Sequence, residues 1–156
     1  MRKTRVVVGM SGGVDSSVAA IVVLDSAFLL VEEETRAGVR LNQPAGHLEA
    51  GETLVEAAVR ETIEETGYGV APTALVGIYR WQAPDAAETF IRFAFAAEVV
   101  AHDPQRPLDK GILRAVWLSY EELVARRAMH RSPLVLRCVD DYRAGVRRPL
   151  DLVTEM

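Results

Sequence analysis

Short runs of apolar residues alternate with turns rich in glycine, proline and aspartate along most of the chain. This pattern is typical of a domain built from both strands and helices. Two apolar runs, 17–24 and 27–32, flank the dipeptide Asp25-Ser26 and predict a β-hairpin. Further strands are expected over 74–81, 89–98 and 115–118. With the helices described next, these strands predict a fold of the α+β class.

The clearest helix is predicted over 53–66. Thr53 and Glu56 form a capping box at its start, and Gly67 follows at the position that favours a left-handed cap. On a helical wheel the half expected to be buried consists of Leu54, Val55, Ala58, Val59, Thr62, Ile63 and Thr66. The half expected to face solvent consists of Glu56, Ala57, Arg60, Glu61, Glu64 and Glu65.

Two helices are expected nearer the C-terminus. A second capping box predicts a helix over 119–130, and a serine–proline pair at 132–133 begins a last helix that stops at Gly145. The single cysteine, Cys138, lies on the apolar stripe of this last helix. A buried thiol with a structural role is therefore expected, in place of a nucleophile.

Composition limits the class of protein. The chain has 156 residues, of which 49% are apolar, and a formal net charge of −4. These values indicate one domain with a real core and exclude a disordered chain. The negative net charge is not typical of a protein that binds nucleic acid through contacts with its phosphates. With one cysteine and no apolar stretch long enough to cross a bilayer, we expect a reduced, cytoplasmic protein without membrane contact.

Acidic residues are concentrated on the central helix. Glu61, Glu64 and Glu65 stand at positions i, i+3 and i+4 on one face, where like charges repel by about 0.2–0.5 kcal/mol per pair. Mg²⁺ is a natural counter-charge because it binds carboxylate oxygens together with waters and substrate phosphates. Arg60 stands four residues before Glu64 and can hold that carboxylate in one orientation. On spacing alone, a solvated acidic face is the alternative.

The wider spacing around this helix resembles the Nudix box, Gly-x5-Glu-x7-Arg-Glu-U-x-Glu-Glu-x-Gly-U, in which U is a bulky aliphatic residue. Gly46, Glu52 and the run 60–68 stand at the required offsets. Only Thr62 and Tyr68, at the two U positions, depart from the signature. Four further segments resemble the NudJ-type phosphatase branch of this family: 42–49, 79–81, 131–135 and 149–152.

The resemblance covers the chain from about residue 17 and implies an α/β/α sandwich with a mixed sheet. It also implies hydrolysis of a diphosphate bond with Mg²⁺ or Mn²⁺ as the cofactor. The implied metal ligands are Glu61, Glu64, Glu65 and the carbonyl of Ala45 or Gly46. The implied catalytic residues are Glu61 and Glu64, with Arg60 and Glu52 as their orienting partners. A general base from a later loop is left open among Asp85, Glu98 and Asp109.

Four residues are candidates for substrate binding: His47, Tyr79, Arg80 and Trp81. His47 adjoins the expected metal loop. Tyr79 and Trp81 alternate along a strand and could stack on a base; the alternative is that they pack beneath the last helix. Arg80 and Arg92 could reach phosphate or be ordinary surface arginines.

By resemblance, the expected activity removes terminal phosphate from nucleoside di- and triphosphates. Hydroxymethylpyrimidine diphosphate is a second implied substrate. The first alternative is a pyrophosphohydrolase that yields nucleoside monophosphate and pyrophosphate. The second is a nucleotide-binding module without hydrolytic activity. The partner is thus a small molecule in each case, and a homodimer is compatible with the family.

The N-terminal residues carry a second resemblance. Residues 5–17 are similar to the start of a tRNA 2-thiouridylase, including the Ser-Gly-Gly-x-Asp-Ser loop of the ATP pyrophosphatase group at 11–16. Sulfur transfer needs catalytic cysteines and a tRNA-binding surface, which this composition does not offer. We therefore interpret 1–16 as an extension or graft on a Nudix domain over 17–156. Residues 5–8 are expected to be extended and 11–15 to form an exposed loop. A retained ATP-binding role is the alternative, and removal of 1–16 is expected to spare hydrolysis.

Overall fold

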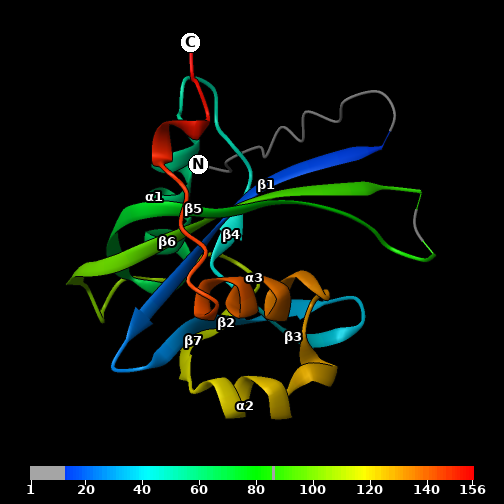
Figure 1. Ribbon diagram of the computed structural model, residues 1–156. Helices are drawn as coiled ribbons and strands as arrows, with labels where there is room; N and C mark the ends of the chain where they lie inside the picture. The colour runs from blue at the N-terminus through cyan, green and yellow to red at the C-terminus, as the bar shows by residue number, and fades with distance from the viewer. Residues whose placement is uncertain (1–12, 86) are drawn as a thin grey trace.

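The computed structural model describes residues 13–85 and 87–156. Within them, seven strands form a mixed sheet with helices on both faces (Figure 1). The strands are β1 (Val14–Leu24), β2 (Ala27–Thr35), β3 (Gly38–Asn42), β4 (Ala45–Gly46), β5 (Tyr68–Gln82), β6 (Thr89–His102) and β7 (Ile112–Leu118). The helices are α1 (Leu54–Thr66), α2 (Tyr120–Ala125) and α3 (Leu134–Arg143), with short 3₁₀ turns η1 (Arg127–Met129) and η2 (Leu150–Leu152).

The strand β1 lies at the centre of the sheet, whose order is β3-β2-β1-β6-β5. β4 pairs with β1, and β7 pairs with β2. β1 and β6 run parallel, whereas the remaining pairs are antiparallel. A central strand covered on both faces is expected to be apolar without alternation. The continuous buried run over 18–22 follows from this position.

The predicted hairpin between β1 and β2 is confirmed. Leu24 pairs with Ala27 across a two-residue turn. The turn residues Asp25 and Ser26 have φ angles of 49° and 64°. Positive φ at both positions gives a turn whose twist matches that of the flanking strands.

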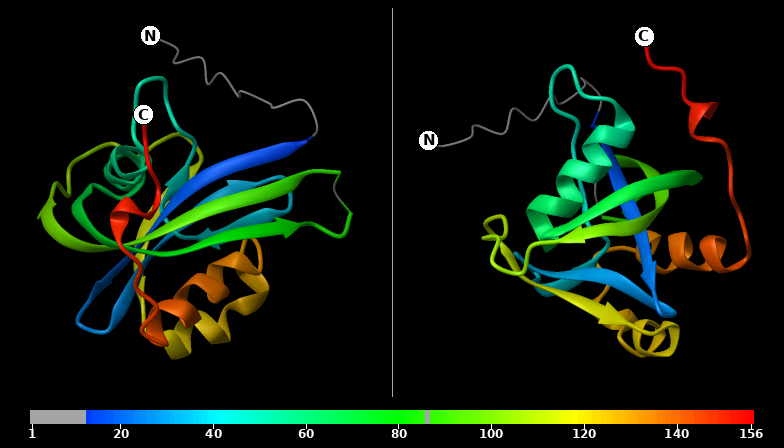
Figure 2. Two further views of the ribbon diagram at one scale, coloured as in Figure 1. Left: turned by 45° about the horizontal axis from the view of Figure 1, so that its top comes forward. Right: turned by 90° about the vertical axis from the view of Figure 1, so that its left-hand side faces the viewer.

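Helices α1 and α3 cover opposite faces of the sheet (Figure 2). The α1 face holds a cluster that includes Val18, Leu75 and Phe95, together with Leu54 and Ala58 of the helix. The α3 face holds a second cluster, in which the strand residues Ile21, Val76 and Ala94 pack with Val135, Cys138 and Val139. This arrangement confirms the expected α/β/α sandwich.

The predicted helix caps are also present. The Oγ1 of Thr53 accepts a hydrogen bond from the backbone N–H of Glu56 at 3.1 Å, and a Glu56 carboxylate oxygen accepts one from the Thr53 backbone at 2.9 Å. Ser119 and Glu122 form the same reciprocal pair before α2. Gly67 ends α1 with φ 76°, a conformation that glycine adopts without a Cβ clash.

Towards the C-terminus, one helix is shorter than expected. α2 ends at Ala125, and the 3₁₀ turn η1 completes the stretch expected to reach residue 130. The last helix begins at Leu134, one residue later than predicted, with Pro133 at the N-cap position. The Oγ of Ser132 accepts a hydrogen bond from the backbone N–H of Leu134 at 3.2 Å. The helix is followed by Gly145, whose φ is 83°.

The expected solvent-facing half of α1 is partly wrong. Glu61 and Glu65 retain only 5% and 6% of their accessible surface, and Ala57 retains none. The reason is that α1 contacts β4 and β7 as well as β1 and β5, so that two sides of the helix are covered. Of the half expected to be buried, three residues are only half-buried: Val55, Val59 and Ile63.

The expectation of an exposed loop over 11–15 holds for Gly13, which lies in an exposed turn, and is wrong for the two residues that follow it. Val14 and Asp15 are half-buried and belong to β1. They extend that strand because they pair in parallel with Thr89 and Phe90 of β6. The expected strand over 5–8 lies outside the described residues.

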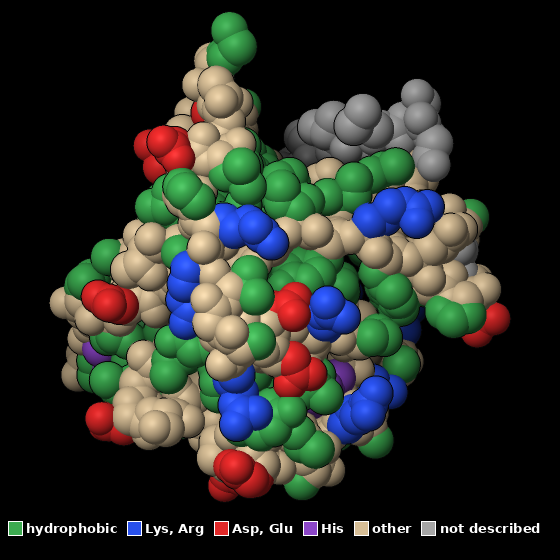
Figure 3. Space-filling view, in the orientation of Figure 1, with side chains coloured by type: hydrophobic (Ala, Val, Ile, Leu, Met, Phe, Trp, Pro, Cys, Tyr) green, Lys and Arg blue, Asp and Glu red, His purple; other side chains and the backbone are tan. Residues whose placement is uncertain are grey.

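Charged side chains of both signs are interspersed on the face that carries α3 (Figure 3). On α3 itself, Arg137 and Asp141 form an ion pair with 3.1 Å between Nε and Oδ2. Within the described part of the chain, every helix is too short or too polar to cross a bilayer.

The position of Cys138 predicts a thiol that does not react while the protein is folded. The residue is fully buried, and burial raises the pKa of its thiol to about 11. A disulfide reagent such as DTNB at pH 8 should therefore label native protein at least about a hundredfold more slowly than the urea-unfolded chain, since the thiolate is the reactive form. Rapid stoichiometric labelling of the native protein would contradict the burial of Cys138.

Candidate active site

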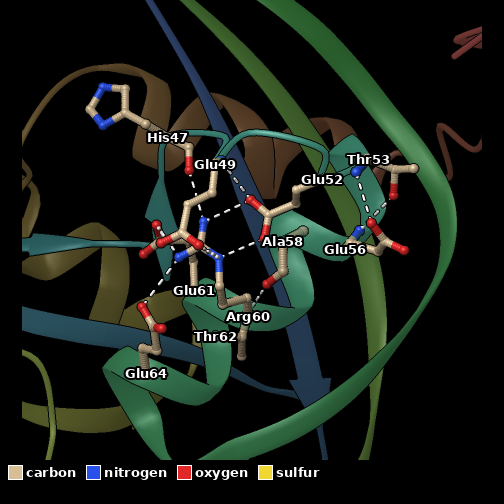
Figure 4. Close-up of polar contacts among 10 residues, drawn as sticks. All are labelled: His47, Glu49, Glu52, Thr53, Glu56, Ala58, Arg60, Glu61, Thr62 and Glu64. Carbon is tan, nitrogen blue, oxygen red and sulfur yellow. Dashed lines mark hydrogen bonds and ion pairs between the residues drawn. The ribbon is translucent and has the colours of Figure 1, made fainter. Parts of the chain in front are cut away.

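Arg60 is the centre of a polar cluster on α1 (Figure 4). Its Nε and Nη2 donate to the two carboxylate oxygens of Glu52, at 2.6 and 2.9 Å. Its Nη1 donates to Glu61 at 2.9 Å and to Glu64 at 3.2 Å. Nη2 also donates to the backbone carbonyl of His47 at 2.8 Å. One guanidinium therefore joins the helix to the preceding loop and orients two carboxylates.

The charges in this cluster reinforce one another. The hydrogen bonds from Arg60 hold the pKa of Glu52 below its ordinary value, and the backbone N–H of Glu49 acts in the same direction. Glu52 in turn raises the pKa of Arg60, with a further contribution from Glu61. Two-point contact between a guanidinium and a carboxylate fixes orientation as well as distance. The cluster is therefore a rigid support for the neighbouring carboxylates.

Gly46 lies against the carboxylate of Glu61. It belongs to β4 and pairs with Val18 of β1, which fixes its backbone in the sheet. A Cβ at this position would overlap the Glu61 carboxylate. Only glycine therefore lets the loop backbone approach that carboxylate so closely.

Glu65 is buried beside the other carboxylates, and not on the solvent-facing side of α1. Its burial raises its pKa to about 9, assisted by the negative charges of Glu61, Glu33 and Asp109. A hydrogen bond with the backbone of Ala45 opposes this shift. In the absence of a cation, Glu65 therefore holds a proton at neutral pH.

Asp109, one of three candidates left open by the sequence, lies close to the α1 carboxylates. One carboxylate oxygen from each of Glu61, Glu64 and Asp109 lies within 4.8 Å of the other two. The backbone N–H of Asp109 donates to the carbonyl of Glu64 at 3.0 Å, which fixes the loop between β6 and β7 against α1. The other candidates, Glu98 and Asp85, are exposed and belong to no such group among the described residues.

The donor set of this group fits a hard divalent cation. Carboxylate oxygens are the ligands that Mg²⁺ and Mn²⁺ prefer, whereas the soft ions select sulfur or imidazole. The raised pKa of Glu65 also favours a cation at this group. A nearby cation would take the place of the proton that this carboxylate otherwise holds among its acidic neighbours.

His47 does not direct its side chain toward the carboxylates. Its imidazole points away from Arg60 and the glutamates (Figure 4). Its Nε2 lies 2.5 Å from Oδ1 of Asp15, the second residue of β1. Sequence reasoning did not predict this contact, because Asp15 was expected to lie in a separate loop.

The aromatic candidates on β5 have different surroundings. The hydroxyl of Tyr79 donates to Asp141 of α3 at 2.8 Å, and the ring packs against the α3 cluster, as in the packing alternative. Trp81 is half-buried, with its ring centroid 5.5 Å from that of Phe90. Arg80 is exposed.

Arg92 is not an ordinary surface arginine, which was one of the two alternatives left open by the sequence. It retains 6% of its accessible surface. Its Nη1 and Nη2 donate to the side-chain oxygens of Gln43 at 3.0 Å and of Asn42 at 3.1 Å. Burial lowers its pKa. It is buried because α3 covers the sheet face to which its side chain projects.

Known proteins are similar to the part of the chain that contains these site residues. The NUDIX domain family matches residues 15–138. Phosphatase NudJ of Escherichia coli strain K12 and that of Shigella flexneri are each 43% identical over 137 residues, which cover 88% of this chain and 88% of each relative. A solved NUDIX hydrolase from Nitrosomonas europaea is 48% identical and aligns with a TM-score of 0.88, covering 91% of this chain and 97% of that one.

The family match spans the helix that carries Arg60 and the glutamates, and the relatives match most of the chain at high identity. The solved relative also shares the sandwich in which α1 packs against the sheet. The chain therefore belongs to the Nudix family and is a hydrolase related to the phosphatase NudJ.

Proposed function

We propose that this hydrolase cleaves a diphosphate linkage in nucleoside di- and triphosphates with Mg²⁺ or Mn²⁺ and releases phosphate in the cytoplasm. The observation that carries the proposal is the group of carboxylate oxygens from Glu61, Glu64 and Asp109 beside the Arg60 cluster. The similar proteins are phosphatases by name, which supports inorganic phosphate as the product. Hydroxymethylpyrimidine diphosphate is a second proposed substrate.

Residues on three segments would hold the metal. Glu61 and Glu64 come from α1 and Asp109 from the β6–β7 loop, while Glu65 and the carbonyl of Gly46 are proposed as further ligands. When bound, a divalent cation stabilises negative charge on the phosphate oxygens and lowers the pKa of a bound water. Arg60 keeps Glu61 and Glu64 in position, through the contacts at 2.9 and 3.2 Å.

The reaction requires an acceptor for the proton of the attacking water. The water oxygen forms a bond to the terminal phosphorus while the bond from that phosphorus to the bridging oxygen breaks. We propose that the carboxylate of Asp109 takes the proton, since it lies beside the carboxylates of the helix on a loop that is hydrogen-bonded to Glu64. His47, Arg80 and Trp81 remain candidates for contacts with the substrate. Tyr79 is a weaker one because its hydroxyl is bonded to Asp141.

Product analysis tests the proposed reaction. GDP, GTP, 8-oxo-dGTP and hydroxymethylpyrimidine diphosphate should each be incubated with Mg²⁺ or with EDTA, and phosphate and pyrophosphate measured separately. We expect phosphate release that EDTA abolishes. Pyrophosphate from the triphosphates alone would indicate a pyrophosphohydrolase. Absence of any product from folded protein would indicate a nucleotide-binding module.

Substitution of the proposed ligands should separate catalysis from folding. Glu64→Gln and Asp109→Asn should each lower kcat at least about a hundredfold, because metal-assisted charge stabilisation is worth several kcal/mol and each 1.4 kcal/mol is a factor of ten. The Tm of Glu64→Gln should change little, since Arg60 keeps its two bonds to Glu52. Glu98→Gln is the matched control for an exposed acid and should behave as wild type. Full activity of Asp109→Asn would leave the general base to be sought elsewhere.

The buried carboxylate of Glu65 predicts a pH-dependent stability in metal-free protein. Its pKa in the folded chain is about 9, above the ordinary 4.5, so the folded state holds a proton that the unfolded chain releases. The free energy of unfolding should therefore fall as pH rises from about 5 to about 9. Glu65→Gln, which mimics the protonated carboxyl, should flatten this dependence while hydrolysis falls. Urea unfolding in EDTA at several pH values measures it, and an unchanged slope in the variant would contradict the assignment.

A further inference from the structure

Asp15 belongs to the Ser-Gly-Gly-Val-Asp-Ser segment, for which the proposed hydrolysis has no use. The end of this segment is nevertheless part of the central sheet. Asp15 pairs in parallel with Phe90 of β6, and the carbonyl of Gly13 accepts a hydrogen bond from the backbone N–H of Thr89 at 2.6 Å. The backbone of Asp15 is therefore held in the sheet.

The sheet register directs Asp15 toward the loop that carries Gly46. Val18 pairs with Gly46 in antiparallel register, and His47 follows Gly46 directly, so the chain leaves β4 toward the end of β1 that contains Asp15. The carboxylate thus reaches the imidazole, with Oδ1 2.5 Å from Nε2.

His47 is held from two directions. Asp15 contacts its imidazole, and Arg60 donates to its backbone carbonyl at 2.8 Å. The same guanidinium bonds Glu61, against whose carboxylate Gly46 lies. The carbonyl of His47 and the carboxylate of Glu61 therefore share one donor, the guanidinium of Arg60.

We propose that Asp15 is a positioning residue of the hydrolase: by binding His47, it fixes the loop 45–49 against Arg60 and Glu61. Because a carboxylate only accepts hydrogen bonds, it also selects the tautomer in which Nε2 of His47 carries the proton. The aspartate of the segment that resembles an ATP pyrophosphatase loop thus serves the Nudix domain. Removal of 1–16, expected from the sequence to spare hydrolysis, would delete this contact.

The kinetic part of the test rests on the proposed function. In the full chain, Asp15→Ala and His47→Ala should each lower kcat about fivefold, the upper end for an exposed ion pair. KM should stay nearly unchanged in Asp15→Ala, because Asp15 is not proposed to contact the substrate. The double variant should lose no more than the larger single loss, because both substitutions break one contact. Ser16→Ala, an exposed neighbour on the same strand, is the matched control and should retain wild-type kcat. Multiplicative losses in the double variant, or wild-type kcat in Asp15→Ala, would overturn the proposal.

A spectroscopic readout separates this proposal from the proposed function. In ¹⁵N NMR of the histidine rings, His47 should be protonated at Nε2 in wild type, and this preference should weaken in Asp15→Ala and persist in Ser16→Ala. The resonances that disappear in His47→Ala are those of the His47 ring. If wild type lacks hydrolysis but the tautomer depends on Asp15, the proposed function fails and the contact stands. An unchanged His47 signal in Asp15→Ala overturns the positioning role even if hydrolysis is present.

Discussion

The guanidinium of Arg60 is the interaction on which the arrangement of the site depends. It bonds Glu52 in the loop, Glu61 and Glu64 on the helix, and the carbonyl of His47. Without the positive charge of this guanidinium, the carboxylates would repel one another. The guanidinium also fixes the position of the loop relative to the helix, because it is bonded to both.

The contacts of Arg60 hold the neighbouring carboxylates in a buried position, although burying a carboxylate costs free energy. Glu65 shows that cost, because burial and the neighbouring acids raise its pKa to about 9. A helix that served only the core would carry apolar residues at positions 61 and 65. The acids at these positions are consistent with the proposal that the group binds a divalent cation, whose charge would offset the repulsion among the carboxylates.

Local signals in the sequence predicted much of the fold. The capping boxes at Thr53 and Ser119 and the turn at Asp25-Ser26 act through neighbours in the chain, and all three have the expected geometry. The i, i+4 spacing predicted the contact between Arg60 and Glu64, and the resemblance to the Nudix box implied that Glu52 is a partner of Arg60. Such features could be read from the sequence because they depend on contacts within a few residues or on a fixed helical period.

The sequence by itself determined the helix, its caps, its row of glutamates and the arginine that orients them. Only the tertiary structure decided which of these glutamates are buried, because a second covered side of α1 comes from β4 and β7, far apart in the chain. It also brought Asp109 to the carboxylates, buried Arg92 beneath α3 and joined Asp15 to His47. Each of these outcomes depends on strand pairing or packing between distant segments, and neither helical periodicity nor local spacing contains that information.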